Sequence, residues 1–243
     1  MRAITCRAPS LHLGLALVGW LVIASVPAMP LDEQASVTQS VSEPTTTVAV
    51  TLRTVMGNIE LELYPNRAPV TVRNFLAYVD AGHFDGGSFY RVVRLDNDNG
   101  DPKIQVIQGG ASLSGRGAFP PIAHESTEET GLLHTDGTIS MARGDINTAT
   151  SEFFICVGDQ PGLDYGAARN TDLQGFAAFG QVISGMDVVR SINRIRDTMS
   201  GDTGYTGGQM LNEPVQILEA VTDRLRIPIR FLGTPEFLGE STH

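Results

Sequence analysis

Short strand-like segments follow one another along most of this chain, and they restrict its fold more than any other feature. Each is rich in β-branched and aromatic residues and is bounded by residues that form turns. Residues 48–64 contain two alternating segments around MGN and predict a hairpin. Six more candidates follow: FYRVV, IQVIQ, GTISMAR, EFFICVG, FAAFGQVI and EPVQILEAVTD.

Only two segments have the apolar spacing of a helix. They are APVTVRNFLAYVDAGHF (68–84), where Gly82 predicts the end, and GMDVVRSINRI (185–195). The 243 residues show no repeat and no second domain. Eight strands with two helices predict an antiparallel barrel or sandwich on which the helices pack.

The two ends of the chain differ from this central part. Residues 1–28 combine Arg2 and Arg7, an apolar run of about 16 residues and the small-residue sequence VPA, the order of a signal peptide. An uncleaved membrane anchor is the alternative, although a span needs about 20 apolar residues. We expect a flexible linker at 29–47, a domain at 48–225 and a tail of no assigned role at 226–243. The expected location is the periplasm; a secreted or membrane-tethered protein remains the alternative.

Charge and cysteine content exclude several classes of protein. The net charge is -10 and the chain has a single lysine, Lys103, which argues against nucleic-acid binding. Removal of residues 1–28 would leave Cys156 as the one cysteine, so no internal disulfide can form. The domain must therefore take its stability from a hydrophobic core.

Most motifs of enzyme chemistry are missing from the sequence. It contains no G-x-S-x-G elbow, no phosphate-binding glycine-rich motif and no paired-cysteine zinc site. The acidic run DNDNGD (96–101) lacks the spacing of a calcium loop and is interpreted as a solvated turn. Structural or solvated roles are expected for His124 and His134, and buried packing is expected for Cys156.

Three polar residues interrupt otherwise apolar strands: Arg91, Gln105 and Gln108. Taken alone, Arg91 is typical of a paired structural or surface arginine. Side-chain alternation predicts which residues share a face. Phe89, Arg91 and Val93 are predicted to share one face of their strand. In the next strand, Val106 and Gln108 share one face, and Gln105 and Ile107 share the other. Glu152 and Phe154 share a face of a third strand.

Five blocks of sequence resemble one family. FYRVV, VIQGG, GTISMAR, SEFFICVGDQPGLD and GFAAFGQVISGMDVV occur in the order, and nearly at the spacing, found in cyclophilins, the peptidyl-prolyl cis/trans isomerases. The similarity covers about residues 48–224 and is closest to the exported bacterial type. It implies a mainly β fold, an eight-stranded antiparallel closed barrel capped by two α-helices, with a substrate groove on its surface.

The resemblance also implies a reaction and its partners. Cyclophilins catalyse rotation about X-Pro peptide bonds, which is slow because amide resonance imposes a barrier of about 18–20 kcal/mol. This reaction needs no nucleophile, metal or cofactor, in agreement with the missing motifs. The expected partners are proline-containing peptides and unfolded or newly exported proteins, whose folding the protein would assist as a monomer.

Residue roles transfer to this chain by position. The resemblance implies that Arg91 is the catalytic donor to the prolyl nitrogen and that Gln108 binds substrate backbone. The remaining substrate-binding positions are Val106, Phe154 and Leu163 in the proline pocket, Ala142 and Arg143 beside the substrate strand, and Phe176, where some members have histidine.

Four departures from the family pattern stand out. The chain is longer between Arg91 and Gln108, where RLDNDNGDP adds a polar loop, and YGAARNTDLQG replaces the pocket tryptophan region. Gln105 stands where a pocket phenylalanine is typical, and Glu152 replaces a glutamine. These departures keep a second hypothesis open, a cyclophilin-fold binding module or chaperone with weak or no catalysis. A ligand-carrying barrel is a third reading, but alternation predicts an interior filled by large side chains.

Overall fold

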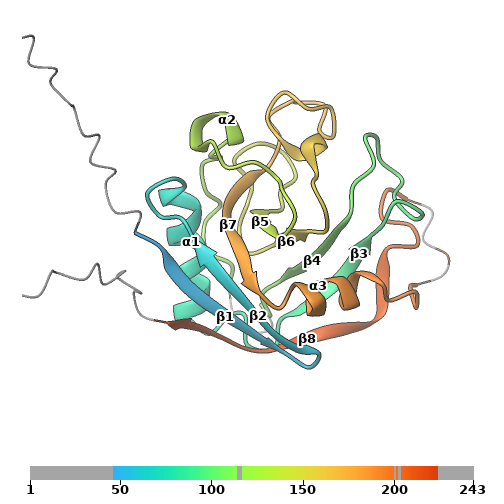
Figure 1. Ribbon diagram of the computed structural model, residues 1–243, viewed down its shortest axis with the longest axis horizontal. Coiled ribbons are helices and arrows are strands. Elements are labelled where there is room, and N and C mark those ends of the chain that lie inside the picture. Colours follow the sequence, from blue (N-terminus) through green and yellow to red (C-terminus); the bar gives the residue numbers. More distant parts are fainter. Residues whose placement is uncertain (1–45, 114–116, 200, 202–203, 224–243) are drawn as a thin grey trace, which may run out of the picture. The chain divides into compact units, whose positions relative to one another are not determined.

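The computed structural model describes residues 46–113, 117–199, 201 and 204–223, which form a closed antiparallel barrel (Figure 1). Its strands are β1 (Val48–Thr54), β2 (Gly57–Leu63), β3 (Ser88–Val93), β4 (Val106–Gly110), β5 (Thr138–Met141), β6 (Phe153–Cys156), β7 (Ala177–Ser184) and β8 (Met210–Asp223). The helices are α1 (Pro69–Asp80), α2 (Thr127–Thr130) and α3 (Met186–Asn193), with a 3-10 turn, η1, at Pro161–Leu163. The prediction of a mainly β, eight-stranded barrel with two main helices is confirmed.

The predicted terminal segments lie mostly outside the described residues. These are the signal peptide (1–28), the linker (29–47) apart from Thr46 and Thr47, and the tail (226–243).

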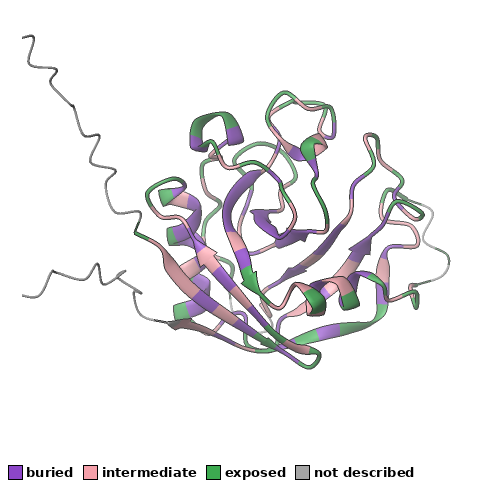
Figure 2. Cartoon of the chain, viewed as in Figure 1, coloured by how far each residue is buried: buried purple, intermediate pink, exposed green. Residues whose placement is uncertain are grey.

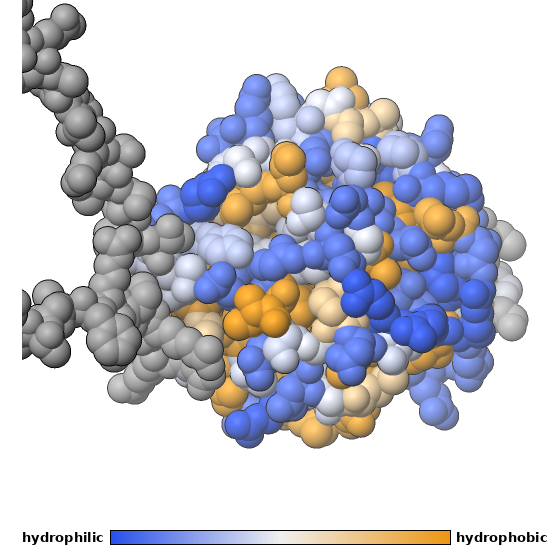
Figure 3. All heavy atoms as spheres, in the orientation of Figure 1, coloured by the Kyte–Doolittle hydropathy of each residue, from blue (hydrophilic) through white to orange (hydrophobic). Residues whose placement is uncertain are grey.

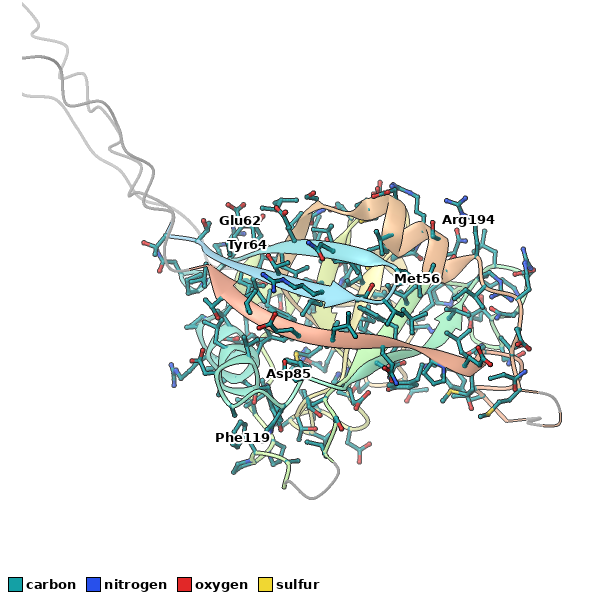
Figure 4. All side chains as sticks on the ribbon, turned by 90° about the horizontal axis from the view of Figure 1, so that it is seen from below. Met56, Glu62, Tyr64, Asp85, Phe119 and Arg194 are labelled. Atoms are coloured by element: carbon teal, nitrogen blue, oxygen red, sulfur yellow. The ribbon has the colours of Figure 1, made fainter. Side chains whose placement is uncertain are left out.

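The order of strands around the barrel is β1-β2-β7-β5-β6-β4-β3-β8, so the first and last strands are neighbours. β1 and β2 form the predicted hairpin, with Met56 at its turn (Figure 4). Gly57 follows at φ 131°, and a Cβ there would lie 2.9 Å from Cγ2 of Val188 in α3. Glycine is therefore needed where the hairpin meets the helix.

Large apolar side chains fill the barrel interior. The ring of Phe153 meets the rings of Phe75, Phe84 and Phe89 edge-on, with centroids 5.5–5.7 Å apart, a favourable geometry for aromatic pairs. Figure 2 shows buried residues along the strands that enclose this interior. The packed interior contradicts the ligand-carrying barrel and agrees with the alternation of the sequence.

Helix α1 is tied to the barrel by its apolar face and by distant polar contacts. Val72 and Phe75 are buried in the core as the spacing predicts. The helix has Pro69 in its first turn and no side-chain cap of its own. Instead, the carboxylate of Glu125 accepts the backbone N–H groups of Val70 and Thr71 at 3.0 and 2.8 Å. This contact satisfies donors that a helix start leaves free.

A bulge in β3 changes which residues face outward. Phe89 pairs with Gly109 and Arg91 with Gln108, so the register shifts at Tyr90. Phe89 lies in the barrel core, whereas Arg91 lines a cavity on the outside. The prediction that Phe89 and Arg91 share a face is therefore wrong, because a bulge inserts one residue and breaks strict alternation.

The face of the domain seen in Figure 3 mixes hydrophilic residues with hydrophobic patches. Phe119 lies below α1 in the view of Figure 4, where its backbone N–H donates to the hydroxyl of Tyr78 at 2.8 Å. Among the described residues, no helix has the length and apolar character needed to cross a bilayer.

Candidate active site

A cavity of about 380 Å³ opens on the outer side of the barrel, next to β3, β4 and β6. Its floor belongs to a small apolar cluster separate from the barrel core. Eight of the ten predicted site residues line the cavity: Arg91, Val106, Gln108, Ala142, Arg143, Phe154, Leu163 and Phe176. Segments far apart in the sequence therefore meet at one place, as the resemblance implied.

Arg91 is held at the edge of this cavity by two glutamines. Its Nε and Nη2 donate to Oε1 of Gln209 at 2.9 and 2.6 Å, and its Nη1 donates to Oε1 of Gln108 at 2.8 Å. A guanidinium has five N–H groups and no acceptor. Three of them are used by the two glutamines, and a further hydrogen bond joins Arg91 to the side chain of Tyr205. Burial lowers the pKa of Arg91, but an arginine keeps its charge in proteins.

Behind Gln108 lies a chain of hydrogen bonds that ends at a carboxyl group. Nε2 of Gln108 donates to the hydroxyl oxygen of Tyr90 at 2.8 Å, and that hydroxyl donates to Oε2 of Glu152. Burial raises the pKa of Tyr90, and the neighbouring carboxylate raises it further, so the hydroxyl stays protonated. Burial also raises the pKa of Glu152, against the hydrogen bond from Tyr90.

The apolar wall of the cavity is built from aromatic rings and Leu163. Phe154 and Phe176 meet edge-on with centroids 5.3 Å apart, and the ring of His134 stacks behind Phe154 at 5.9 Å. His134 is fixed by Asp164 at 2.7 Å and by Ser140 at 2.9 Å. It therefore has the structural role that the sequence predicted.

Arg143 supports the apolar wall of the cavity beside Phe176. It forms a bidentate ion pair with Asp172, at 2.7 and 3.0 Å, and donates to the backbone oxygen of Gly175. The Arg143 guanidinium lowers the pKa of Asp172 to about 2. Its carbon atom Cζ lies 5.4 Å from the centroid of the Phe176 ring, within the range of a cation–π contact.

The acidic run after β3 is a turn with Asp96, Asn99 and Asp101 exposed, as the sequence predicted, but Asp98 is not solvated. The Asp98 side chain is fully buried and forms a bidentate ion pair with Arg169, with both distances 2.8 Å. Hydrogen bonds from Arg169 and from the backbone of Ile104 and Gly100 outweigh burial and keep the pKa of Asp98 below its ordinary value. Local sequence could not reveal the pair, because its partners are 71 residues apart.

Two predicted site residues do not line this cavity. Gln105 is absent from its wall, where Ile104 takes part instead. The backbone of Gln105 is bonded to Val157, so alternation turns its side chain away from the face that carries Val106. Glu152 lines a neighbouring hollow of about 190 Å³, which shares Gln108 and Arg143 with the main cavity.

Further residues of the cavity wall were not predicted. Arg169, Asn170 and Tyr205 come from loops. The Tyr205 ring lies close to two guanidinium groups, since Cζ of Arg91 and Cζ of Arg169 lie 5.4 and 5.3 Å from its centroid. Gln209, directly before β8, bonds to Arg91 but lies outside the wall. The one signal in the sequence is that YGAARNTDLQG, which contains Arg169 and Asn170, departs from the family pattern.

The chemistry available at this site is hydrogen bonding and apolar contact. In the part of the chain that the structure describes, no group of three or more His, Cys, Asp or Glu residues could hold a metal ion. Cys156 is buried, and its burial raises the pKa of the thiol, which suits packing and not nucleophilic attack.

Comparison with known proteins assigns the family. A family model described as cyclophilin type peptidyl-prolyl cis-trans isomerase/CLD matches residues 47–221. Peptidyl-prolyl cis-trans isomerase A of Dickeya dadantii is 40% identical over 155 residues, which cover 63% of this chain and 74% of that protein. Peptidyl-prolyl cis-trans isomerase B of Escherichia coli is 35% identical over 156 residues, covering 63% and 88%.

Solved structures agree on the fold. A crystal structure of a cyclophilin type peptidyl-prolyl cis-trans isomerase from Cryptosporidium parvum has a TM-score of 0.56 and 21% identity, covering 73% of this chain and 98% of that one. A second structure of the same protein, in the presence of the dipeptide Ala-Pro, has a TM-score of 0.55. The chain belongs to the cyclophilin-type peptidyl-prolyl cis-trans isomerases, and it is an enzyme of that kind.

Proposed function

We propose that the cavity binds the segment around an X-Pro bond and that Arg91 stabilises the twisted form of that bond. The proline ring packs against the apolar wall of Val106, Phe154 and Leu163. The guanidinium of Arg91 donates to the prolyl nitrogen, whose lone pair becomes available as amide resonance is lost. The observation that carries this proposal is a guanidinium held in a fixed position beside an apolar wall.

This arrangement favours the transition state over the ground state. In a planar amide the nitrogen lone pair is delocalised, so it accepts hydrogen bonds only when the bond rotates. An interaction made only in the twisted form lowers the barrier, by about tenfold in rate for each 1.36 kcal/mol. Arginine suits the task because its charge is permanent and its donors form a rigid fork.

Proline exchange in a short X-Pro peptide tests the proposal. Arg91→Ala is expected to lower kcat/KM at least about tenfold, because hydrogen bonds to charged groups contribute roughly 1.5–3 kcal/mol. Arg53→Ala is the matched control, since Arg53 is exposed on β1 and pairs with Glu219. Undiminished exchange with Arg91→Ala would refute the assignment. Peptide binding by the wild type without acceleration would favour the binding-module hypothesis.

We also propose that the clients are exported proteins that fold after transport. The proposal is supported by the sequence of residues 1–28, in which two arginines precede an apolar run and a small-residue site. Alkaline phosphatase, which is active only after export, can be fused behind residues 1–47. Activity is expected for this fusion and should be lost with Leu17→Arg in the apolar run. An inactive wild-type fusion would contradict the proposal.

A further inference from the structure

Arg91 depends on a residue that sequence similarity does not point to. We propose that Gln209 is a positioning residue for Arg91 and that the loop between β3 and β4 (residues 94–105) holds Gln209 in place. The proposal rests on the proposed role of Arg91 in isomerisation. It gives the added loop a function in that reaction.

Gln209 accepts more hydrogen bonds from Arg91 than Gln108 does. One amide oxygen of Gln209 accepts two, from Nε and Nη2. Nε lies at the base of the fork, so a bond there limits rotation of the whole plane. Gln108 accepts only from Nη1. Gln209 thus sets the plane of the guanidinium.

The orientation of the two glutamine amides also supports this role. A guanidinium offers only donors, so each glutamine must turn its oxygen toward Arg91 and its NH₂ group away. In Gln108 the NH₂ group donates to Tyr90 at 2.8 Å. In Gln209 it donates to the backbone oxygen of Asn97 at 2.9 Å. Both amides are therefore held with the oxygen facing the guanidinium.

The loop between β3 and β4 fixes the position of Gln209. The side-chain NH₂ of Asn97 donates to the backbone oxygen of Gly208 at 3.0 Å, one residue before Gln209. The backbone of Gln209 itself pairs with Val92, next to Arg91, at 2.9 Å. Gln209 is fully buried. The adjoining Asp98 anchors the same loop to Arg169 through the buried ion pair.

A positioning role predicts a particular kinetic signature. Gln209 is not part of the cavity wall, so its loss should leave the pocket for the proline ring intact. The loss should instead let the guanidinium plane turn away from the prolyl nitrogen. The rate of exchange should fall while peptide affinity stays nearly constant.

Gln209→Met keeps the length of the side chain and removes both the acceptor and the donor. We expect kcat/KM in peptide exchange to fall about tenfold, with less than a twofold change in the Kd of a proline peptide measured by titration. Gln181→Met is the matched control, because Gln181 lies on β7 and its NH₂ group also donates to a backbone oxygen, that of Asp136. The control should retain the wild-type rate.

A double-mutant cycle with Arg91→Lys separates positioning from a general structural effect. Lysine cannot use the fork geometry, so Gln209→Met should change kcat/KM less than twofold in the Arg91→Lys background. An equal tenfold loss in both backgrounds, or a wild-type rate for Gln209→Met alone, would overturn the inference. Full activity of Arg91→Lys would instead refute the role of Arg91 itself, and the inference would fall with it.

A second variant covers the case in which Gln209→Met does not fold. Asn97→Ala removes the side-chain bonds to the backbone oxygens of Gly208 and Val92 and the bond accepted from the backbone N–H of Arg94. It should lower kcat/KM about threefold and speed hydrogen exchange at the Arg91 Nε–H, followed by NMR. Unchanged exchange at that proton would count against the loop as the support of Gln209.

Discussion

Breaking the Asp98–Arg169 ion pair should cost a large part of the stability of the domain. The side chains of Asp98 and Arg169 are 0% and 1% exposed, and the carboxylate also accepts the backbone N–H groups of Ile104 at 2.8 Å and Gly100 at 3.0 Å. Asp98→Ala leaves a buried guanidinium with the backbone oxygen of Pro102 as its remaining acceptor. Removing one partner of a buried pair typically costs about 3–5 kcal/mol.

Urea unfolding followed by circular dichroism measures this cost. With a slope of about 2 kcal/mol per molar urea, the midpoint should fall by roughly 1.5–2.5 M. The double variant Asp98→Leu with Arg169→Met should recover most of the loss, because well-packed apolar residues replace buried ion pairs at little cost. A shift below about 0.5 M for Asp98→Ala would refute the reasoning.

The same pair predicts a dependence on pH. The folded pKa of Asp98 is lowered, so the ionised group stabilises the fold above its unfolded pKa, about 3.9. That contribution is lost as the pH falls through the lowered folded pKa. The stability of the wild type should therefore drop more steeply below about pH 4 than that of Asp98→Asn. Parallel curves for the two proteins would contradict this explanation.

Three further predictions concern the cavity. Phe154→Ala removes a buried ring from the proposed proline pocket and should cost about 3–5 kcal/mol in urea unfolding and raise the Kd of a proline peptide. Ile104→Ala should weaken peptide binding in titration, whereas Gln105→Phe should change the Kd less than twofold, because Ile104 lines the cavity and Gln105 does not. A larger effect of Gln105→Phe would place Gln105 in the pocket. Burial raises the pKa of Glu152, so ionisation of this carboxyl group opposes folding. The free energy of unfolding should therefore decline as the pH rises from the ordinary carboxyl pKa through the raised pKa of the folded state. Glu152→Gln should abolish this decline in denaturation curves.

Regular alternation made the barrel predictable. All eight strands and both main helices follow from local patterns, because each element shows its own apolar period. The bulge at Tyr90 did not follow, since it depends on how β3 fits between β4 and β8. Helix α2 was missed although its sequence contained a signal: Ser126 and Glu129 form a capping box at its start.

The site was predictable only where the family pattern reaches. Arg91, Gln108 and Phe154 stand in blocks that resemble cyclophilins, and the structure brings them to one cavity. Gln209 lies 118 residues from Arg91 in the sequence and has no local pattern that sets it apart. Contacts of this kind depend on barrel closure, which places the start of β8 beside β3.

The closure of the barrel by β1 and β8 also has a kinetic consequence. Ala49 is paired with Asp223, so the last of the eight strands to be synthesised is the one that closes the barrel. Pairings between distant parts of a chain form slowly, because loop closure costs entropy before any contact is gained. We therefore expect the growing chain to stay unfolded until residues 210–223 are available. The native barrel should form only after β8 has been synthesised.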